Sequence, residues 1–307
     1  MPEVNVDKQR EYLVVKSNEL IQRSRYSMPL SMQKAFAFIC SLIRPPCNGK
    51  NYIWPNELLT YVFDIRDYCN VCGIDYASGG SALRHIKRSL KALADESIYI
   101  DMDDNKEVLC RWIDYISIEK RTGTVTVTLG KHLAPYLFNL KEKFTEYELW
   151  NILLMKSAYS IRLYELLKSY VNKKEAYFTV EELRRFLFIK GSGCRVCRDN
   201  NTKKCLCCDE YKKSYKEFKE FKKKVLSYAV TEINDLSDLV VTMNVCLSGH
   251  TAKGVHFGIK LRGQITHQLH KHLTLRNLKV PGKERINIYA KNYSNIITES
   301  SIIKSQS

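Results

Sequence analysis

The sequence predicts an α+β protein of two tandem winged-helix domains, related as a pseudo-repeat and followed by a basic C-terminal tail. Three observations support this fold class: one order of elements occurs twice, each half carries a basic amphipathic helix, and a β-hairpin pattern follows each of these helices. The 307 residues suffice for two domains with separate cores. We expect the domains at residues 12–140 and 150–263, a join near Lys141–Tyr147, and a basic, partly flexible tail at 264–307.

Each half opens with an apolar helix and a short block of similar sequence. The helices are expected over Gln33–Ile43 and over Ser160–Tyr170. The block YIWPNELLTY (residues 52–61) resembles YFTVEELRRF (residues 177–186). Pro55 and Thr179 are residue types that begin helices, so each block predicts a short extended piece that enters a helix. Two unrelated α+β domains are the alternative, which the matching spacing disfavours.

A β-hairpin pattern closes each half. Alternating β-branched residues around a Gly-containing turn are typical of a hairpin. The paired runs are Trp112–Ile118 with Thr124–Leu129, joined through Lys120–Gly123, and Leu239–Val245 with Val255–Leu261, joined through Ser248–Gly254. The order helix, short strand, helix, helix, hairpin is that of a winged helix, in which the hairpin is the wing.

A basic amphipathic helix precedes each hairpin, over about Ser81–Asp95 in the first half and Tyr215–Leu236 in the second. Apolar residues at helical spacing form the core-facing sides: Leu83, Ile86, Leu90 and Leu93 in the first helix, and Phe218, Phe221, Val225, Ala229 and Ile233 in the second. The outer sides are cationic: Arg84, Lys87, Arg88 and Lys91 in the first helix, and Lys212, Lys213, Lys216, Lys219, Lys222, Lys223 and Lys224 in or just before the second.

These cationic sides are candidate DNA-binding surfaces, because a helix with one face in the core and a charged outer face suits a major groove about 12 Å wide. Lys side chains contact mainly phosphates, whereas Arg84 and Arg88 are better suited to guanine edges. Lys253, in the second turn, would contact the flanking backbone as part of a wing. Solvated helix faces are the alternative. The scarcity of acidic partners four residues away disfavours it for the first helix.

The composition agrees with a polyanionic partner. Lys and Arg total 49 against 33 Asp and Glu, which gives a net charge of +16 and a pI near 9.3. No apolar run is long enough to cross a bilayer and the N-terminus is too polar for a signal peptide, so we expect a cytoplasmic protein without a membrane role. In that compartment the 11 cysteines would be reduced thiols or metal ligands.

Four cysteines have the spacing of a structural zinc site: Cys194, Cys197, Cys205 and Cys208. They form two Cys-x-x-Cys pairs separated by seven residues, and thiolates with this spacing can bind one tetrahedral Zn²⁺. Reduced surface thiols are the alternative. The pair Cys69 and Cys72 recurs eight residues after Tyr61, as Cys194 does after Phe186, but has no second pair nearby, so buried or free thiols are expected there. Three further cysteines are expected in the core: Cys40, Cys110 and Cys246.

Five segments resemble the Rep initiator proteins of bacterial iteron plasmids, in that family's order and spacing. They are Val14–Ile21, Arg25–Ser27, Met32–Lys34, Arg162–Leu167 and Phe218–Asn234. The resemblance implies a replication initiator that binds repeated double-stranded DNA sites (iterons) as a monomer, helps to open the origin and recruits host replication proteins. It also implies a homodimer, formed through the N-terminal domain, that represses its own transcription.

The same resemblance assigns DNA contact to Lys222, Lys223 and Lys224, where family members commonly carry Arg. The Cys-rich segment Gly191–Glu210 is an insertion relative to the family pattern.

Two other functions fit parts of the sequence. A chromosomal transcription regulator would share the fold, and direct repeats beside an AT-rich stretch, rather than a lone palindrome, would distinguish an initiator from it. A DNA-nicking initiator would use a tyrosine and a metal held by a His-hydrophobic-His motif, but His270-Lys271-His272 has a charged middle residue. No Gly-x4-Gly-Lys-Ser/Thr motif for ATP is present. We therefore expect no enzymatic activity and no nucleotide cofactor.

Overall fold

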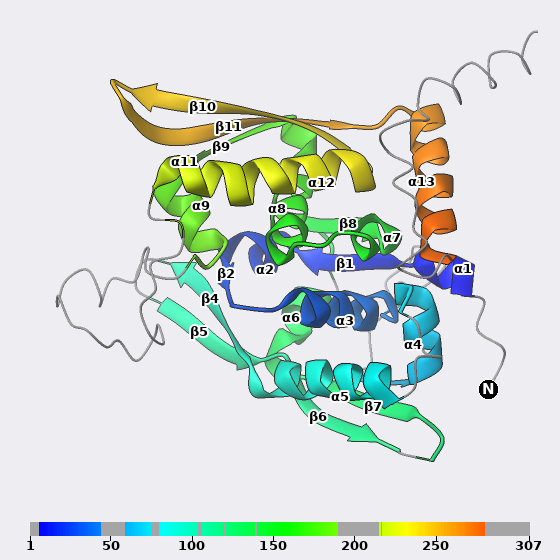
Figure 1. Ribbon diagram of the computed structural model, residues 1–307. Helices are drawn as coiled ribbons and strands as arrows, with labels where there is room; N and C mark the ends of the chain where they lie inside the picture. The colour runs from blue at the N-terminus through cyan, green and yellow to red at the C-terminus, as the bar shows by residue number, and fades with distance from the viewer. Residues whose placement is uncertain are drawn as a thin grey trace, which may run out of the picture.

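The computed structural model describes residues 6–43, 59–74, 80–103, 106–119, 121–138, 140–189, 215 and 217–279. Two domains lie one above the other in Figure 1, with β1 (Leu13–Ser17) and β8 (Phe144–Glu148) between them. Each domain contains a three-stranded antiparallel sheet with the same order of strands. The predicted pair of winged-helix domains is thereby confirmed.

The first domain contains the predicted apolar helix, basic helix and hairpin. Its elements are α3 (Leu30–Ser41), β3 (Thr60–Asp64), α4 (Ile65–Cys72), α5 (Gly80–Asp95), β6 (Ile113–Ile118) and β7 (Thr124–Leu129). The sheet order is β3-β7-β6. Strand β7, with the sequence TVTVTL, buries Val125, Val127 and Leu129 on one face, as its alternation requires.

The first domain also has a second sheet that the sequence did not predict. It has the order β2-β4-β5 and consists of β2 (Ser24–Arg25), β4 (Ser97–Asp103) and β5 (Lys106–Arg111). Ile98 and Ile100 of β4 are fully buried, whereas Leu109 of β5 is 57% exposed. Strand β5 therefore forms one edge of this sheet among the described strands.

The second domain repeats the first. Its elements are α8 (Ala158–Lys168), β9 (Glu175–Thr179), α9 (Val180–Phe186), α11 (Phe218–Phe221), the π-helical turn η4 (Lys222–Ser227), α12 (Tyr228–Leu236), β10 (Leu239–Ser248) and β11 (Thr251–Leu261). The sheet order is β9-β11-β10. The two wing strands are longer than predicted, because Ser248 pairs with Thr251 and residues expected in the turn continue β11.

The predicted match between the blocks at 52–61 and 177–186 was wrong in register. Residues 177–186 contain β9 and α9, and the equivalent β3 and α4 lie at 60–72. Tyr61 is therefore in a strand, and Pro55 lies outside the described residues. Each helix starts at a polar cap: the Thr179 side chain accepts from the backbone N–H of Glu182, and the Asp64 carboxylate accepts from that of Arg66.

Cysteine positions follow from this corrected register. Cys69 and Cys72 are buried in α4, so they do not occupy the place of Cys194, which comes after α9. Cys40 and Cys110 are buried as predicted, whereas Cys246, in β10, is only half-buried.

The expected join at 141–147 contains part of a strand rather than a free linker. β8 pairs antiparallel with β1, from Leu13 opposite Glu148 to Ser17 opposite Phe144. Lys16 of β1 forms a buried ion pair with Glu165 of α8 (Nζ–Oε1 2.6 Å). The first strand of the described chain is thus tied to the second domain.

Two more contacts strengthen this junction. The Tyr147 hydroxyl donates to Glu165 (2.6 Å), and burial, together with that carboxylate, raises the pKa of Tyr147. The Arg162 guanidinium packs against the rings of Tyr26 and Phe186, 4.0 and 4.2 Å from their centroids.

Residues 264–279 form a helix, α13 (Gln264–Lys279), where the sequence predicted a tail. It packs against α7 (Trp150–Leu153), and Lys271 forms ion pairs with Glu148 of β8 (2.8 Å) and with Glu11 (3.3 Å). Its buried side includes the polar residues His270, Thr274 and Asn277, so no apolar period marks it. Within the described residues, no helix combines the length and apolarity that crossing a membrane needs.

Five short helices complete the described chain: α1 (Val6–Arg10), α2 (Asn18–Arg23), α6 (Ala134–Leu137) and the 3₁₀ helices η2 (Lys131–Leu133) and η3 (Val171–Lys173). The Arg10 guanidinium donates to the carbonyl oxygens of Asn70 and Val71, near the C-terminal end of α4. The N-terminal helix α1 is thereby fixed to the first domain.

Candidate nucleic-acid interface

Helix α5 has the two faces that its sequence predicted. Ile86, Leu90 and Leu93 are buried, and the helix packs against α3 and β6. The four predicted contact residues lie on the other side, with Arg84, Arg88 and Lys91 exposed and Lys87 half-buried. No ion pair among the described residues involves them. The side chain of Leu83 lies outside the described set.

The second basic helix is a continuous helical segment, α11–η4–α12, that we call the recognition helix. The predicted core residues Phe221, Val225, Ala229 and Ile233 are buried, whereas Phe218 is only half-buried. The exposed cations are Lys219, Lys222, Lys223 and Lys224. Three other predicted contacts lie outside the described residues: Lys212, Lys213 and Lys216.

The π-helical turn gathers cations at one end of the recognition helix. In such a turn the backbone hydrogen bond spans five residues rather than four. The neighbours Val225 and Leu226 are therefore both buried, while Lys222–Lys224 all remain exposed. Lys224 forms an ion pair with Glu220, so Lys222 and Lys223 are the better candidates for phosphate contact.

Two polar residues that the sequence did not single out fix the recognition helix to its domain. The Glu232 carboxylate accepts from the backbone N–H groups of Lys156 (2.8 Å) and Ser157 (3.1 Å), at the start of α8. The Asn234 side chain exchanges two hydrogen bonds with the backbone of Val241 in β10 (2.9 and 2.7 Å). Both lie in the Glu-Ile-Asn ending of the segment Phe218–Asn234, which carries the family resemblance. That resemblance is the sequence feature from which these two residues could have been identified.

Both wings turn tightly. The first turns through Gly123 (φ +80°) and the second through Gly249 (φ +59°), and such left-handed backbone favours glycine. In the second wing Lys253 is exposed, as a wing contact requires. Gly254 is needed beside it, because a side chain there would collide with the Tyr177 ring.

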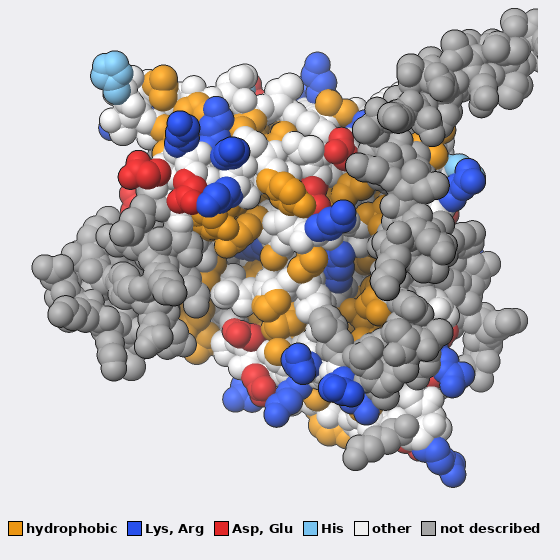
Figure 2. Space-filling model, viewed as in Figure 1, with side chains coloured by type: hydrophobic (Ala, Val, Ile, Leu, Met, Phe, Trp, Pro, Cys, Tyr) orange, Lys and Arg blue, Asp and Glu red, His pale blue; other side chains and the backbone are white. Residues whose placement is uncertain are grey.

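Basic side chains of both domains lie on the face of the molecule that Figure 2 shows. Figure 2, drawn from the side of Figure 1, shows Lys and Arg over α11 and again over α5. The two helices come from different domains, yet the junction through β1, β8 and α8 fixes both toward the same side. One extended polyanion could therefore contact both.

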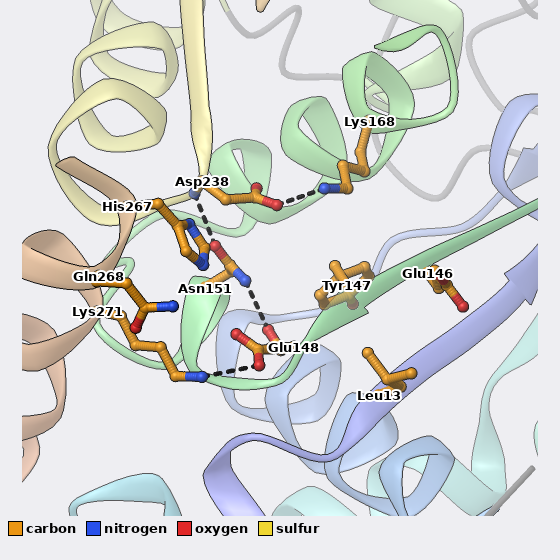
Figure 3. Close-up of a pocket in the computed structure, with 10 residues that line it drawn as sticks. All are labelled: Leu13, Glu146, Tyr147, Glu148, Asn151, Lys168, Asp238, His267, Gln268 and Lys271. Carbon is orange, nitrogen blue, oxygen red and sulfur yellow. Dashed lines mark hydrogen bonds and ion pairs between the residues drawn. The ribbon is translucent and has the colours of Figure 1, made fainter. Parts of the chain in front are cut away.

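A cavity of about 260 Å³ lies at the junction, between β8, α7, α8 and α13 (Figure 3). Four of its charged groups form two ion pairs: Lys271 with Glu148 and Lys168 with Asp238. Asn151 accepts from the Asp238 backbone N–H (2.7 Å). None of the described DNA-binding candidates lines the cavity, so it belongs to the junction and not to the basic face.

The sequence offers two candidate metal sites, a histidine pair and a four-cysteine cluster, and the structure describes only the first. His270 is buried and His272 exposed, so the two rings of the histidine pair do not lie on one surface. The four cysteines of the predicted zinc site, Cys194, Cys197, Cys205 and Cys208, lie outside the described residues. Within the described part of the chain, no three His, Cys, Asp or Glu side chains are placed to hold a metal ion together.

Comparisons with known proteins agree with this architecture. Family models match residues 13–168, as "Initiator Replication protein, WH1", and residues 203–259, as "Initiator Rep protein, WH2". A replication initiation protein of Escherichia coli is 25% identical over 236 residues, which cover 76% of this chain and 66% of that protein, just under two thirds of its length. The crystal structure of the Pi initiator protein in complex with iteron DNA matches with a TM-score of 0.62 at 21% identity, over 83% of this chain and 99% of that one.

Proposed function

Because the chain belongs to the initiator replication protein family, we propose that it initiates plasmid replication by binding repeated DNA sites, iterons, at a replication origin. The observation that carries this proposal is the pair of exposed basic helices on one face of two winged-helix domains. The Pi initiator, which shares the fold, is bound to iteron DNA in its own structure.

The two helices would enter major grooves of the same duplex. Arg84 and Arg88 of α5 present guanidinium groups, which can bond both guanine acceptors in the major groove. Lys222 and Lys223 would neutralise phosphates beside the recognition helix, and Lys253 would do so from the wing. Phosphate contacts position the protein, and the arginines then read sequence.

The proposal extends to partners. Among the described strands β5 has one edge without a partner, and its Leu109 is exposed, so we assign the homodimer to this surface of the N-terminal domain, where the strand could pair with its copy. Such a dimer would repress the gene of the initiator, while the monomer would help to open the origin and recruit host replication proteins. These roles follow the family resemblance.

We also propose one structural zinc ion at the thiolates of Cys194, Cys197, Cys205 and Cys208. The support is the spacing of the two Cys-x-x-Cys pairs. Purified protein should then carry about one zinc per chain, measured by elemental analysis after exhaustive dialysis. Folded protein free of metal, with four reactive thiols in this segment, would contradict the zinc site and leave the DNA-binding proposal intact.

A binding titration on DNA fragments from the neighbourhood of the protein's gene tests the central proposal. We expect tight binding confined to a segment with direct repeats, and an affinity that falls steeply as salt rises. Equal binding to every fragment would leave a basic protein that associates with DNA, and the initiator proposal would fail.

A further inference from the structure

The wing of the second domain projects beyond the strand that supports it. β9 pairs with β11 only from Glu175 opposite Gly258 to Thr179 opposite Gly254. Past Gly254, β10 and β11 pair with each other alone among the described strands. We call residues Leu247–Lys253 the wing tip. In Figure 1 this hairpin extends past α11, and Figure 2 shows Lys and Arg side chains beside it, over α11.

Leu247 is an apolar residue on this projection, and it is 65% exposed. It continues the core-facing row of β10, in which Val241 is buried and Met243 and Val245 are half-buried. The row thus runs out of the core and places Leu247 on the helix side of the hairpin. Isolated exposed leucines are common on protein surfaces, but this one lies at the tip of the wing that the proposed function places against DNA.

The rest of the wing tip is a tight turn with mostly polar side chains. Ser248 pairs with Thr251 around the turn at Gly249 and His250, which leaves two residues to reverse the chain. The pairing shifts beyond Cys246, so that Lys253 is the extra residue of a bulge, and bulges bend a strand and re-aim its side chains. Leu247 therefore lies on a short two-stranded hairpin tip, on which His250 and Lys253 are also exposed.

We propose that Leu247 is a wedge that enters the minor groove beside the recognition-helix site and partly unstacks a base step. DNA-bending proteins insert Leu and similar side chains in this way, with cationic neighbours on the phosphates. Pyrimidine–purine steps unstack most easily, so a TA or CA step is the expected target. The wedge couples binding to distortion of the duplex. It rests on the proposed function and adds a mechanical role to it.

The test places the fluorescent base 2-aminopurine, whose emission rises on unstacking, at successive positions across the repeated site. Full-length wild type, Leu247→Ala and the control Leu261→Ala are compared at saturating protein. Leu261 is 55% exposed at the base of the same hairpin, so its variant makes the same chemical change away from the tip. Affinity is measured in parallel by fluorescence anisotropy.

Wild type and Leu261→Ala should raise the emission at one step beside the recognition-helix site. Leu247→Ala should abolish that rise while its affinity changes by less than about tenfold, because the variant also avoids the cost of unstacking. If Leu247→Ala binds and distorts the site like wild type, the wedge is refuted while iteron binding stands. If wild type does not prefer the repeats over other DNA, the proposed function fails and the wedge fails with it.

Discussion

The two winged-helix domains share a frame but differ in what is added to it. Both have a capped second helix and the same sheet order, β3-β7-β6 in one and β9-β11-β10 in the other. The first domain adds the sheet β2-β4-β5 and has a short wing, with strands of six residues. The second has wing strands of ten and eleven residues and a π-helical turn in its recognition helix.

The basic helices of the two domains also differ, in the type of cation that they carry. α5 carries the exposed Arg84, Arg88 and Lys91 and the half-buried Lys87, whereas the described cations of the recognition helix are all lysines. Arginine suits bidentate bonds to guanine and lysine acts more as a point charge. We therefore expect the first domain to contribute more to sequence readout, and the second to contribute more to phosphate binding and, through the proposed wedge, to distortion of the DNA.

The largest expected effect is on the second domain. The double variant Lys222→Glu/Lys223→Glu should abolish specific binding at physiological salt, because two phosphates lose their cations and the new carboxylates repel DNA. The slope of log affinity against log salt should also become shallower, by about 0.9 for each lost phosphate contact. Anisotropy titrations at several salt concentrations measure this. Lys260→Glu, an exposed lysine of β11 in the same domain, is the control and should bind almost normally. Retained affinity in the double variant would refute the recognition-helix assignment.

The next largest effect is expected on stability, at the junction between the two domains. Lys16→Met leaves the Glu165 carboxylate buried without its cation, which should lower the free energy of unfolding by about 3–5 kcal/mol. Urea denaturation measures the loss. Arg23→Met removes the exposed pair with Glu19 and should cost less than about 1 kcal/mol. Equal effects of the two variants would mean that the junction does not hold the domains together.

A pH titration tests the packing of α13. Burial, and then the nearby Arg262 charge, lower the pKa of His270 to about 4. The unfolded chain binds this proton near pH 6.5. Stability is therefore full above pH 6.5 and falls as the pH drops toward 4, by up to about 3 kcal/mol.

Urea denaturation at stepped pH compares wild type with His270→Gln, which should lose this component, and with His272→Gln, which should keep it, since His272 is exposed. The same pH dependence in all three proteins would contradict a buried neutral His270.

The smallest expected effect concerns readout by the first domain. Arg84→Lys/Arg88→Lys keeps both charges, so binding to unrelated DNA and its salt dependence should hardly change. Discrimination against changed G·C pairs should fall by about 1–3 kcal/mol for each guanine that an arginine no longer bonds through both acceptors. Competition with single-base variants of the repeat measures this, and unchanged discrimination would assign sequence readout elsewhere.

Periodic segments of the fold were predictable and aperiodic ones were not. The alternation in Thr124–Leu129 and the apolar spacing of α5 are local signals, and both elements formed as predicted. α13 was missed because its buried side is partly polar, and the register of the first block was wrong because a similar sequence lies a few residues from the true strand–helix pair.

Some residues of the candidate DNA-binding site were likewise predictable from the sequence and others were not. Exposed cations on the two helices follow from helical periodicity alone, so Arg84 and Lys222 could be identified. Glu232 and Asn234 hold the recognition helix through backbone groups of Lys156 and Val241. These are tertiary contacts that no spacing in the sequence reveals.

Hydroxyl-radical footprinting on a single repeat tests most directly the claim that both domains bind one duplex with one face. We expect two protected segments on the same side of the DNA, about one helical turn (about 10 bp) or a multiple of it apart. At low salt and high protein concentration, where residual binding persists, the segment next to the recognition helix should lose protection in Lys222→Glu/Lys223→Glu, and the other segment in Arg84→Glu/Arg88→Glu. A single protected segment, unaffected by changes in α5, would contradict the account and leave the second domain as the sole DNA-binding unit.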